Sequence, residues 1–271
     1  RYFKMNIENL TSLAISACIY GGQEIMSVYN TDFGFELKKD NSPLTIADKN
    51  CNKKIEEILY DSKIPILSEE GKQLNYEERK NWKYLWIVDP LDGTKEFIKK
   101  NGEFTVNVAL VKNNQPIIGV IYVPAKNILY FSNKNVGSYK STISIDEFKD
   151  LASIEELIRE SEKLPIIKNS SKHVIVASRS HMSKETKDFV DRRREIKENI
   201  EIVSIGSSLK ICMVAEGKAD VYPRLAPTME WDVAAGHSIA KYSGFKILNY
   251  DNGTELTYNK ENLLNPFFVV E

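Results

Sequence analysis

The sequence has few residues of the kinds that would indicate a disulfide-stabilised or zinc-binding protein. Its 271 residues include three cysteines and three histidines. The cysteines are odd in number, widely spaced and set in apolar helical patterns, so we expect buried thiols in a reducing compartment. The histidines lack zinc-ligand spacing, which favours oxygen ligands for any metal. These residues are Cys18, Cys51, Cys212, His173, His181 and His237.

Two further absences narrow the class of protein. The net charge of −1 argues against a broadly basic surface for a nucleic-acid polymer. No apolar run approaches the roughly 20 residues that a membrane span needs, and no basic-then-apolar leader opens the sequence. With 42% apolar residues the chain can form one large core or two. We expect a cytoplasmic globular protein, a monomer or a homodimer.

The most informative stretch is a short apolar run that ends in two aspartates. Residues 85–88 predict a buried strand, and Asp89 and Asp92 follow it. Pro90 and Gly93 suit a tight turn that would hold both carboxylates at the end of the strand. Unpaired carboxylates repel each other and resist desolvation, so such a site needs a cation, and oxygen ligands suit Mg²⁺. The alternative is a solvated acidic turn.

The longer string favours the metal site. Asp-Pro-Leu-Asp-Gly-Thr at residues 89–94 resembles the metal motif of the inositol monophosphatase superfamily of Mg²⁺-dependent, lithium-sensitive phosphatases. The continuation over residues 95–97 and 101–107 is similar to the CysQ-type 3′(2′),5′-bisphosphate nucleotidase branch. The resemblance runs from about Asp40 to the C-terminus. It implies an α/β protein with a layered αβαβα sugar-phosphatase-like fold.

The N-terminal half has the pattern of an α+β region. After Asn6, apolar residues recur at helical spacing and predict a long helix. A pair of glycines interrupts this pattern, and we expect the helix to bend or pause there. A second helix carries Asp48 in its first turn, and a charged stretch resembles a mobile connection, helix or lid. Clusters of β-forming residues predict antiparallel strands. The ranges are the glycines 21–22, a short strand 64–67, the charged stretch 72–83, and strands 104–111, 117–123 and 128–131.

The pattern changes after a charged region at residues 138–171, where we place a boundary. Short apolar strands then alternate with helices, which is typical of an α/β unit. We therefore predict a metal-binding α+β region with an antiparallel sheet at residues 1–170. Residues 171–271 would form an α/β region that completes the metal site and the nucleotide pocket.

Three further acidic residues have ordinary explanations in isolation. Asp48 and Asp232 each suit the start of a helix, and Glu69 lies in a loop where adjacent acids are usually solvated. The resemblance gives them other roles. It implies that Glu69 and the Leu91 carbonyl complete one metal site with Asp89, while Asp92 and Asp232 hold a second, for two or three Mg²⁺ ions in all.

The expected reaction is hydrolysis of a phosphate monoester by metal-activated water. Cations would neutralise the charge of the phosphate, orient it and lower the pKa of the water. The N–H groups of Gly93 and Thr94 would bind phosphate at a helix start. The Thr94 hydroxyl, hydrogen-bonded to Asp48, would pass the proton to that carboxylate. No arrangement of Ser, Cys or His residues suggests a covalent phosphoenzyme, so we expect direct in-line attack by water on the phosphate.

Two strings in the C-terminal half are candidates for substrate binding. Residues 178–181 contain Ser178 and His181, and residues 206–210 contain Gly206 and Lys210. An ordinary polar loop and a glycine turn are the alternatives. Hydroxyls, helix-start N–H groups and a lysine can bind a second phosphate and its nucleoside. The strings resemble the AMP contacts of the nucleotidase branch.

The expected substrate is therefore adenosine 3′,5′-bisphosphate, cleaved to AMP and phosphate, with 3′-phosphoadenylyl sulfate as a second candidate. The resemblance connects this activity to sulfur assimilation and allows a peripheral position at the inner membrane. Two alternatives stay open. One is an inositol or sugar monophosphatase with the same metal site, and the other is a non-catalytic sensor of bisphosphorylated nucleotides.

Overall fold

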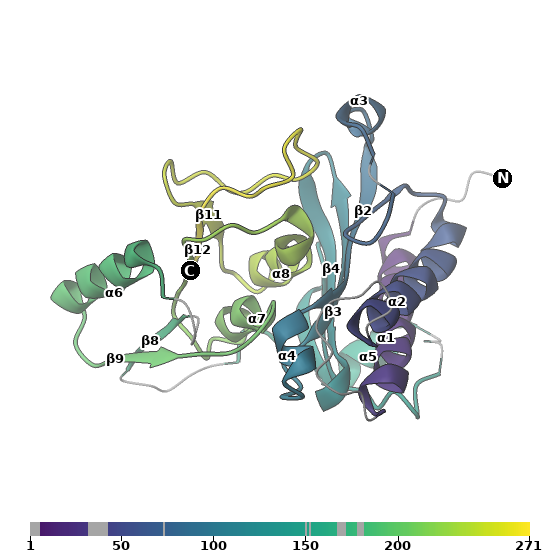
Figure 1. Cartoon of the computed structure of the whole chain (residues 1–271), viewed down its shortest axis with the longest axis horizontal. Coiled ribbons are helices and arrows are strands. Elements are labelled where there is room, and N and C mark those ends of the chain that lie inside the picture. The colour runs from purple at the N-terminus through teal and green to yellow at the C-terminus, as the bar shows by residue number, and fades with distance from the viewer. Residues whose placement is uncertain are drawn as a thin grey trace.

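Five layers of helices and sheets build the molecule, which confirms the predicted αβαβα arrangement (Figure 1). The computed structural model describes residues 6–31, 43–72, 74–149, 151, 153–166, 172–177 and 182–271. Four clusters of buried apolar side chains lie between successive layers. Within the described residues, no helix is both long and apolar enough to cross a membrane.

The first layer contains helices that cover one face of a large sheet. They are α1 (Ile7–Tyr29), α2 (Pro43–Leu59) and α5 (Ile154–Arg159). Helix α1 begins after Asn6, whose side chain accepts the Glu8 N–H at 2.8 Å. The bend expected at Gly21 and Gly22 is wrong, because α1 is one continuous helix. A Cβ on either glycine would lie 2.9 Å from a side-chain atom of α2 or β4, so close packing explains the pair.

The second layer is a seven-stranded sheet in the order β1 to β7. Neighbouring strands are antiparallel except for the parallel pair β1 and β2, as predicted for the central strands. The strands are β1 (Ile66–Ser68), β2 (Tyr84–Asp92), β3 (Thr105–Lys112), β4 (Gln115–Val123), β5 (Ile128–Asn133), β6 (Gly137–Thr142) and β7 (Glu162–Lys163).

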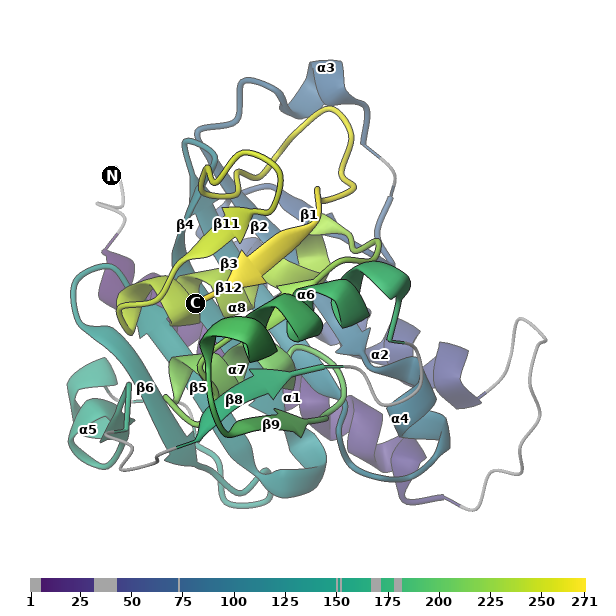
Figure 2. The same cartoon turned by 90° about the vertical axis from the view of Figure 1, so that its left-hand side faces the viewer.

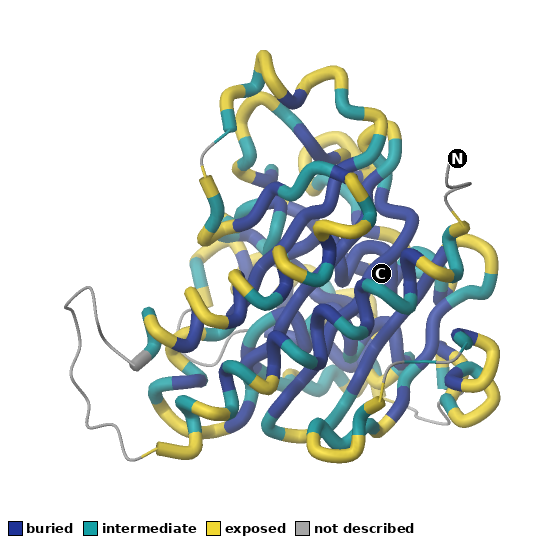
Figure 3. The backbone as a smooth tube through the Cα atoms, turned by 90° about the vertical axis from the view of Figure 1, so that its right-hand side faces the viewer, coloured by how far each residue is buried: buried dark blue, intermediate teal, exposed yellow. Residues whose placement is uncertain are grey.

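Both faces of this sheet are buried, as the dark central strands of Figure 3 show. Side chains alternate between faces along each strand. In β2, Trp86 and Val88 pack toward α1 and α2, whereas Leu85 and Ile87 pack toward the third layer. Residues of β2 that lie on the same face of the sheet as Leu85 and Ile87 therefore point toward the third layer, in the interior of the molecule.

The remaining layers come from the C-terminal part of the chain. Helices α7 (Leu209–Ala215) and α8 (Glu230–Tyr242) lie between the large sheet and a second group of strands. Helix α6 (Lys184–Ile196) covers the outer side of those strands (Figure 2). The strands are β8 (His173–Val176), β9 (Ile200–Val203), β10 (Tyr222–Arg224), β11 (Ile247–Asn249) and β12 (Phe268–Val270). This alternation confirms the predicted α/β pattern.

Two expectations about connecting segments can be compared with the structure. The charged stretch 72–83 contains a short helix, α3 (Tyr76–Arg79), which was one of the predicted alternatives, and the buried Arg79, only 2% exposed, anchors this helix. Residues 138–142, assigned to the charged boundary region, belong to β6. The predicted division at residue 170 falls among residues 167–171, outside the described residues, and stays a prediction. The three cysteines are free and buried, as expected.

Candidate active site

Asp89 and Asp92 lie on the same face of the sheet because β2 contains a bulge. Asp89 pairs with Asn107 of β3, and Asp92 pairs with Thr105. Three steps along β2 thus match two steps along β3, and the extra residue returns the second aspartate to the face of the first. The tight turn expected directly after Val88 is wrong, since β2 continues to Asp92.

The chain leaves the strand at Gly93 instead. This glycine has φ +96° and precedes the short helix α4 (Thr94–Ile98). A Cβ here would lie 3.1 Å from the Glu103 carbonyl oxygen and 3.2 Å from Ser207. The left-handed backbone and the close contacts explain why glycine is needed at this position.

Asp89 is the most deeply buried member of a group of carboxylates and is 1% exposed. Burial, followed by the charges of the neighbouring acids, raises the pKa of Asp89 well above its usual range. Its Oδ1 accepts the Leu91 N–H at 3.1 Å. We call Asp48, Glu69, Asp89, Asp92 and Asp232 the acidic cluster.

Glu69 joins this cluster from the loop after β1 and lies at its exposed rim. The loop is tied to α2, because the Ser68 hydroxyl donates to the Asn52 side chain at 2.6 Å. Partial burial, with the charges of Asp92 and Glu70, raises the pKa of Glu69, while a hydrogen bond with Asp89 opposes the rise.

Asp92 and Asp232 face a more positive environment. Burial and the charge of Asp232 raise the pKa of Asp92 to about 7, against the opposing effects of Lys210, the Ser208 N–H and Arg224. Burial also raises the pKa of Asp232 to about 6, although its Oδ2 accepts the Met229 N–H at 2.8 Å. Asp232 therefore caps the start of α8, as expected for an aspartate at a helix start, and it also belongs to the acidic cluster.

Asp48 lies in the second turn of α2, not in the first as predicted. It is 8% exposed, and burial followed by the charges of Glu70 and Glu69 raises its pKa to about 8. Its Oδ1 has no hydrogen-bond partner among the described residues. Thr94 is exposed, and between these two described residues there is no hydrogen bond of the kind we expected.

The donor set suits a hard cation such as Mg²⁺, because it consists of carboxylate oxygens with no histidine or cysteine among them. In the described part of the chain, no group of three acidic, histidine or cysteine side chains is close enough together to hold a metal ion. The unpartnered Asp48 oxygen and the mutual repulsion of the acids both mark a place where a cation would be favourable. The residues therefore fit the predicted metal.

A cavity of about 330 Å³ opens beside the cluster. Its lining includes Asp92, Gly93 and Asp232 together with Lys210 and Arg224, which bring positive charge to the cavity. Arg224 was not among the predicted site residues. Its Nε is buried and has no partner within the described chain. No local motif marks this arginine, and only the packing of β10 against α7 reveals it.

Helix α7 brings Lys210 to the cavity. The Lys210 ammonium group donates to the Ser207 carbonyl at 3.0 Å. The adjacent Ser208 hydroxyl contacts Thr105 at 2.8 Å and donates to Asn107 at 2.9 Å, which fixes the start of α7 on β3 opposite the two aspartates. Lys210 is thereby held close to the acidic cluster.

The other predicted contacts differ in outcome. The Gly206 N–H donates to Glu103 at 2.8 Å, and a Cβ on Gly206 would lie 2.5 Å from Glu96. Packing thus accounts for this glycine, and a phosphate contact would require its hydrogen bond to open. Ser178 and His181 lie outside the described residues.

The comparisons with known proteins show which family the chain belongs to. Residues 6–266 match the model of the inositol monophosphatase family. The chain belongs to the inositol monophosphatase family. This membership confirms the superfamily that the Asp89–Thr94 motif predicted.

Several relatives carry the name of the predicted branch. The chain is 40% identical over 254 residues to 3′(2′),5′-bisphosphate nucleotidase CysQ of Shigella flexneri, covering 92% of this chain and 94% of that protein. It is 34% identical to the protein of the same name from Haemophilus influenzae, covering 97% and 93%. The crystal structure of CysQ from Bacteroides thetaiotaomicron has a TM-score of 0.94 at 48% identity, covering 100% and 98%.

A more distant structure shares the fold. Inositol monophosphatase II of Staphylococcus aureus has a TM-score of 0.73 at 19% identity, covering 97% of this chain and 88% of that chain. At this identity the likeness supports the layered architecture alone.

Proposed function

We propose that this chain is a 3′(2′),5′-bisphosphate nucleotidase that hydrolyses the 3′-phosphate of adenosine 3′,5′-bisphosphate to AMP and phosphate. The main observation behind this proposal is that one cavity of about 330 Å³ is lined by both acidic residues, Asp92 and Asp232, and basic residues, Lys210 and Arg224. The two acids suit a cation-bound phosphate, and the two basic residues suit a second phosphate on the same molecule. The names of the curated relatives support the same substrate.

We assign the metal to Mg²⁺, with two or three ions. Glu69, Asp89 and the Leu91 carbonyl would hold one ion, with Asp89 shared, and Asp92 and Asp232 would hold another. When bound, the cations supply charge neutralisation of the phosphate and activation of water. Their binding would also remove the repulsion within the acidic cluster.

The chain's own groups would then orient the ester and accept the proton. The N–H groups of Gly93 and Thr94 lie at the start of α4, where they would bind phosphate oxygens. Asp48 has a raised pKa and an unpartnered oxygen, so it can take up a proton passed by the Thr94 hydroxyl once the two are brought into contact. A non-catalytic sensor would not need such a proton path, and the names of the relatives favour an enzyme.

The second phosphate distinguishes the proposed substrate from an inositol or sugar monophosphate. Lys210 and Arg224 can each form charge-assisted hydrogen bonds with it, and the planar arginine can bind it through two N–H groups. Ser178 and His181 are proposed to contact the ribose or base. 3′-Phosphoadenylyl sulfate carries the same 3′-phosphate and is a second proposed substrate.

The decisive experiment compares phosphate release from three substrates in the presence of Mg²⁺. We expect adenosine 3′,5′-bisphosphate to be hydrolysed with a much higher kcat/KM than inositol 1-phosphate or fructose 1,6-bisphosphate. The Asp89→Asn variant is the control for contaminating phosphatase. Equal or better hydrolysis of inositol 1-phosphate would support the monophosphatase instead, and tight binding of the bisphosphate without turnover would support the sensor.

A further inference from the structure

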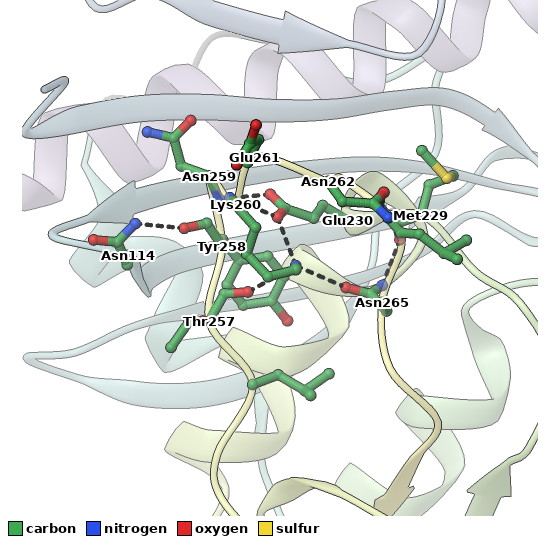
Figure 4. A network of polar contacts seen from close by, with 12 residues as sticks. Asn114, Met229, Glu230, Thr257, Tyr258, Asn259, Lys260, Glu261, Asn262 and Asn265 are labelled. Carbon is green, nitrogen blue, oxygen red and sulfur yellow. Dashed lines mark hydrogen bonds and ion pairs between the residues drawn. The ribbon is translucent and has the colours of Figure 1, made fainter. Parts of the chain in front are cut away.

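A buried carboxylate at the start of α8 holds a C-terminal loop against this helix, which also carries Asp232. Glu230, the first residue of α8, is 0% exposed. Its carboxylate accepts the backbone N–H groups of Asn259 at 2.6 Å and Lys260 at 3.0 Å, and the Lys260 ammonium group at 2.6 Å (Figure 4). Buried acids are stable only when compensated in this way.

The opposite side of the same loop is held by α3. Arg79 donates to the Asn259 side chain at 2.9 Å and to the carbonyls of Lys260 at 2.6 Å and Glu261 at 3.0 Å. The Asn259 side chain in turn donates to the Arg79 carbonyl at 2.8 Å. Arg79 is followed in the chain by β2, the strand that carries Asp89 and Asp92. The loop therefore connects the start of α8 to the segment before β2.

The residues before α8 are held as firmly. Asn265 donates from its side chain to the Met229 carbonyl at 2.7 Å and from its backbone to the Thr228 carbonyl at 2.8 Å. The Met229 N–H donates to Asp232 at 2.8 Å. The segment that the loop fixes is thus the one to which the Asp232 side chain is directly bonded, so any shift of this segment would move the carboxylate.

We propose that Glu230, acting through Lys260, Asn259 and Arg79, is a positioning residue that fixes Asp232 relative to the carboxylates of β2. The inference rests on the proposed metal-binding role of Asp232. Glu230 does not line the cavity that Asp232 lines, so its effect would be exerted through the backbone of residues 229–232. Groups that orient metal ligands are typically worth about 10- to 100-fold in metal affinity.

A matched control comes from a second buried glutamate. Glu216, at the end of α7, is 3% exposed and contacts Lys140 at 3.1 Å and Lys218 at 2.6 Å. It also accepts a hydrogen bond from the Tyr130 hydroxyl. None of these partners belongs to the acidic cluster. Loss of Glu216 should therefore lower stability as loss of Glu230 does, without a direct effect on Asp232.

The experiment measures Mg²⁺ binding by calorimetry on the nucleotide-free protein, together with thermal unfolding in EDTA and steady-state kinetics. The variants are Glu230→Gln, Glu216→Gln and, as a reference for a lost ligand, Asp232→Asn. We expect Glu230→Gln to weaken Mg²⁺ binding by roughly 10- to 100-fold and to lower kcat at fixed Mg²⁺, with KM for the nucleotide unchanged. Glu216→Gln should lower the unfolding temperature but bind Mg²⁺ like the wild type.

Three results would overturn the inference. If Asp232→Asn weakens Mg²⁺ binding and Glu230→Gln does not, Glu230 has no positioning role while the proposed function stands. If Glu230→Gln and Glu216→Gln weaken binding equally, the effect is general destabilisation. If Asp232→Asn binds Mg²⁺ like the wild type, the proposed metal role fails, and the positioning role fails with it.

A milder pair of variants covers the case in which Glu230→Gln does not fold. Lys260→Met removes one of the three bonds to Glu230 from a side chain that is 28% exposed, and Lys260→Arg keeps the charge. We expect weaker Mg²⁺ binding in the methionine variant and recovery in the arginine variant. Wild-type Mg²⁺ affinity in Lys260→Met would contradict the inference.

Discussion

The protein buries carboxylates in two contrasting ways. At Glu216, burial opposes ionisation, but hydrogen bonds from Lys218 and Tyr130 and the charge of Lys140 outweigh it and lower the pKa. In the acidic cluster, burial and mutual repulsion act in the same direction and raise the pKa of Asp89, Asp92 and Asp232. The fold supplies cations to the first site and leaves the second short of positive charge. This deficit is what a bound metal would correct.

The largest test of this contrast is Asp89→Asn. Asp89 is the most deeply buried of the cluster and is assigned to both ions, so we expect the substitution to abolish Mg²⁺-dependent phosphate release. The same change relieves repulsion, so the unfolding temperature in EDTA should rise. The matched Glu216→Gln variant should do the opposite, keeping activity but losing about 1–3 kcal/mol of stability. Near-native turnover in Asp89→Asn would show that the metal assignment is wrong.

The next largest effect concerns Asp48 and Thr94, which we expect to act as a unit. Replacing either residue, by Asp48→Asn or Thr94→Val, should lower kcat by roughly 10²–10⁴-fold, the usual range for acid–base help. The double variant should have a kcat only slightly below that of the more impaired single variant, because the effects of groups that share one step are non-additive. Single-turnover rates at saturating substrate measure this. Fully additive losses would argue against a shared proton path.

Part of the candidate site follows from local signals in the sequence. The acids at 89 and 92 follow an apolar strand, whereas the metal roles of Glu69 and Asp232 came only from the family resemblance, because each residue has an ordinary explanation in isolation. The bulge at residues 90–91 was not predictable, because Pro90 and Gly93 suggest a turn equally well and only pairing with β3 decides between them. The strand therefore continues where a turn was expected.

Long-range contacts account for what was missed. Arg224 reaches the cavity from β10, and the hydrogen bond from Gly206 joins it to Glu103, a residue about a hundred positions away. Glu230 and Arg79 meet through a loop near the C-terminus. None of these contacts leaves a periodic pattern or a motif in the sequence, since each depends on how distant elements pack.

A smaller effect should distinguish the role of the basic residues of the cavity from the role of its acids. Lys210→Ala removes one charge-assisted hydrogen bond, worth about 1.5–3 kcal/mol or roughly 10- to 150-fold in affinity. KM for adenosine 3′,5′-bisphosphate should rise accordingly, while hydrolysis of a small monophosphate stays nearly unchanged. Arg224→Ala should act in the same direction. An equal loss on both substrates would indicate that Lys210 supports the acidic cluster and not the second phosphate.

The smallest effect is a pH dependence of stability that differs in sign between the two kinds of buried acid. The pKa is raised to about 8 for Asp48, about 7 for Asp92 and about 6 for Asp232. A carboxyl group with a raised folded-state pKa stabilises the protein at low pH, and this contribution is lost as the pH rises through the folded pKa. The metal-free protein should therefore lose stability between about pH 4 and 8, as these three groups ionise.

Glu216, with its lowered pKa, has the opposite sign, so its contribution is lost only as the pH falls below the usual range of a glutamate. Urea unfolding at several pH values in EDTA measures the free energy of unfolding, which contains the contributions of all these carboxyl groups. The decline in the free energy of unfolding toward pH 8 should be less steep in Asp92→Asn and unchanged in Glu216→Gln. Added Mg²⁺ should oppose the decline, because it binds the ionised carboxylates and stabilises the folded state more strongly as the pH rises. Metal-free stability that stays constant or rises over this interval would mean that the acidic cluster carries no unbalanced charge.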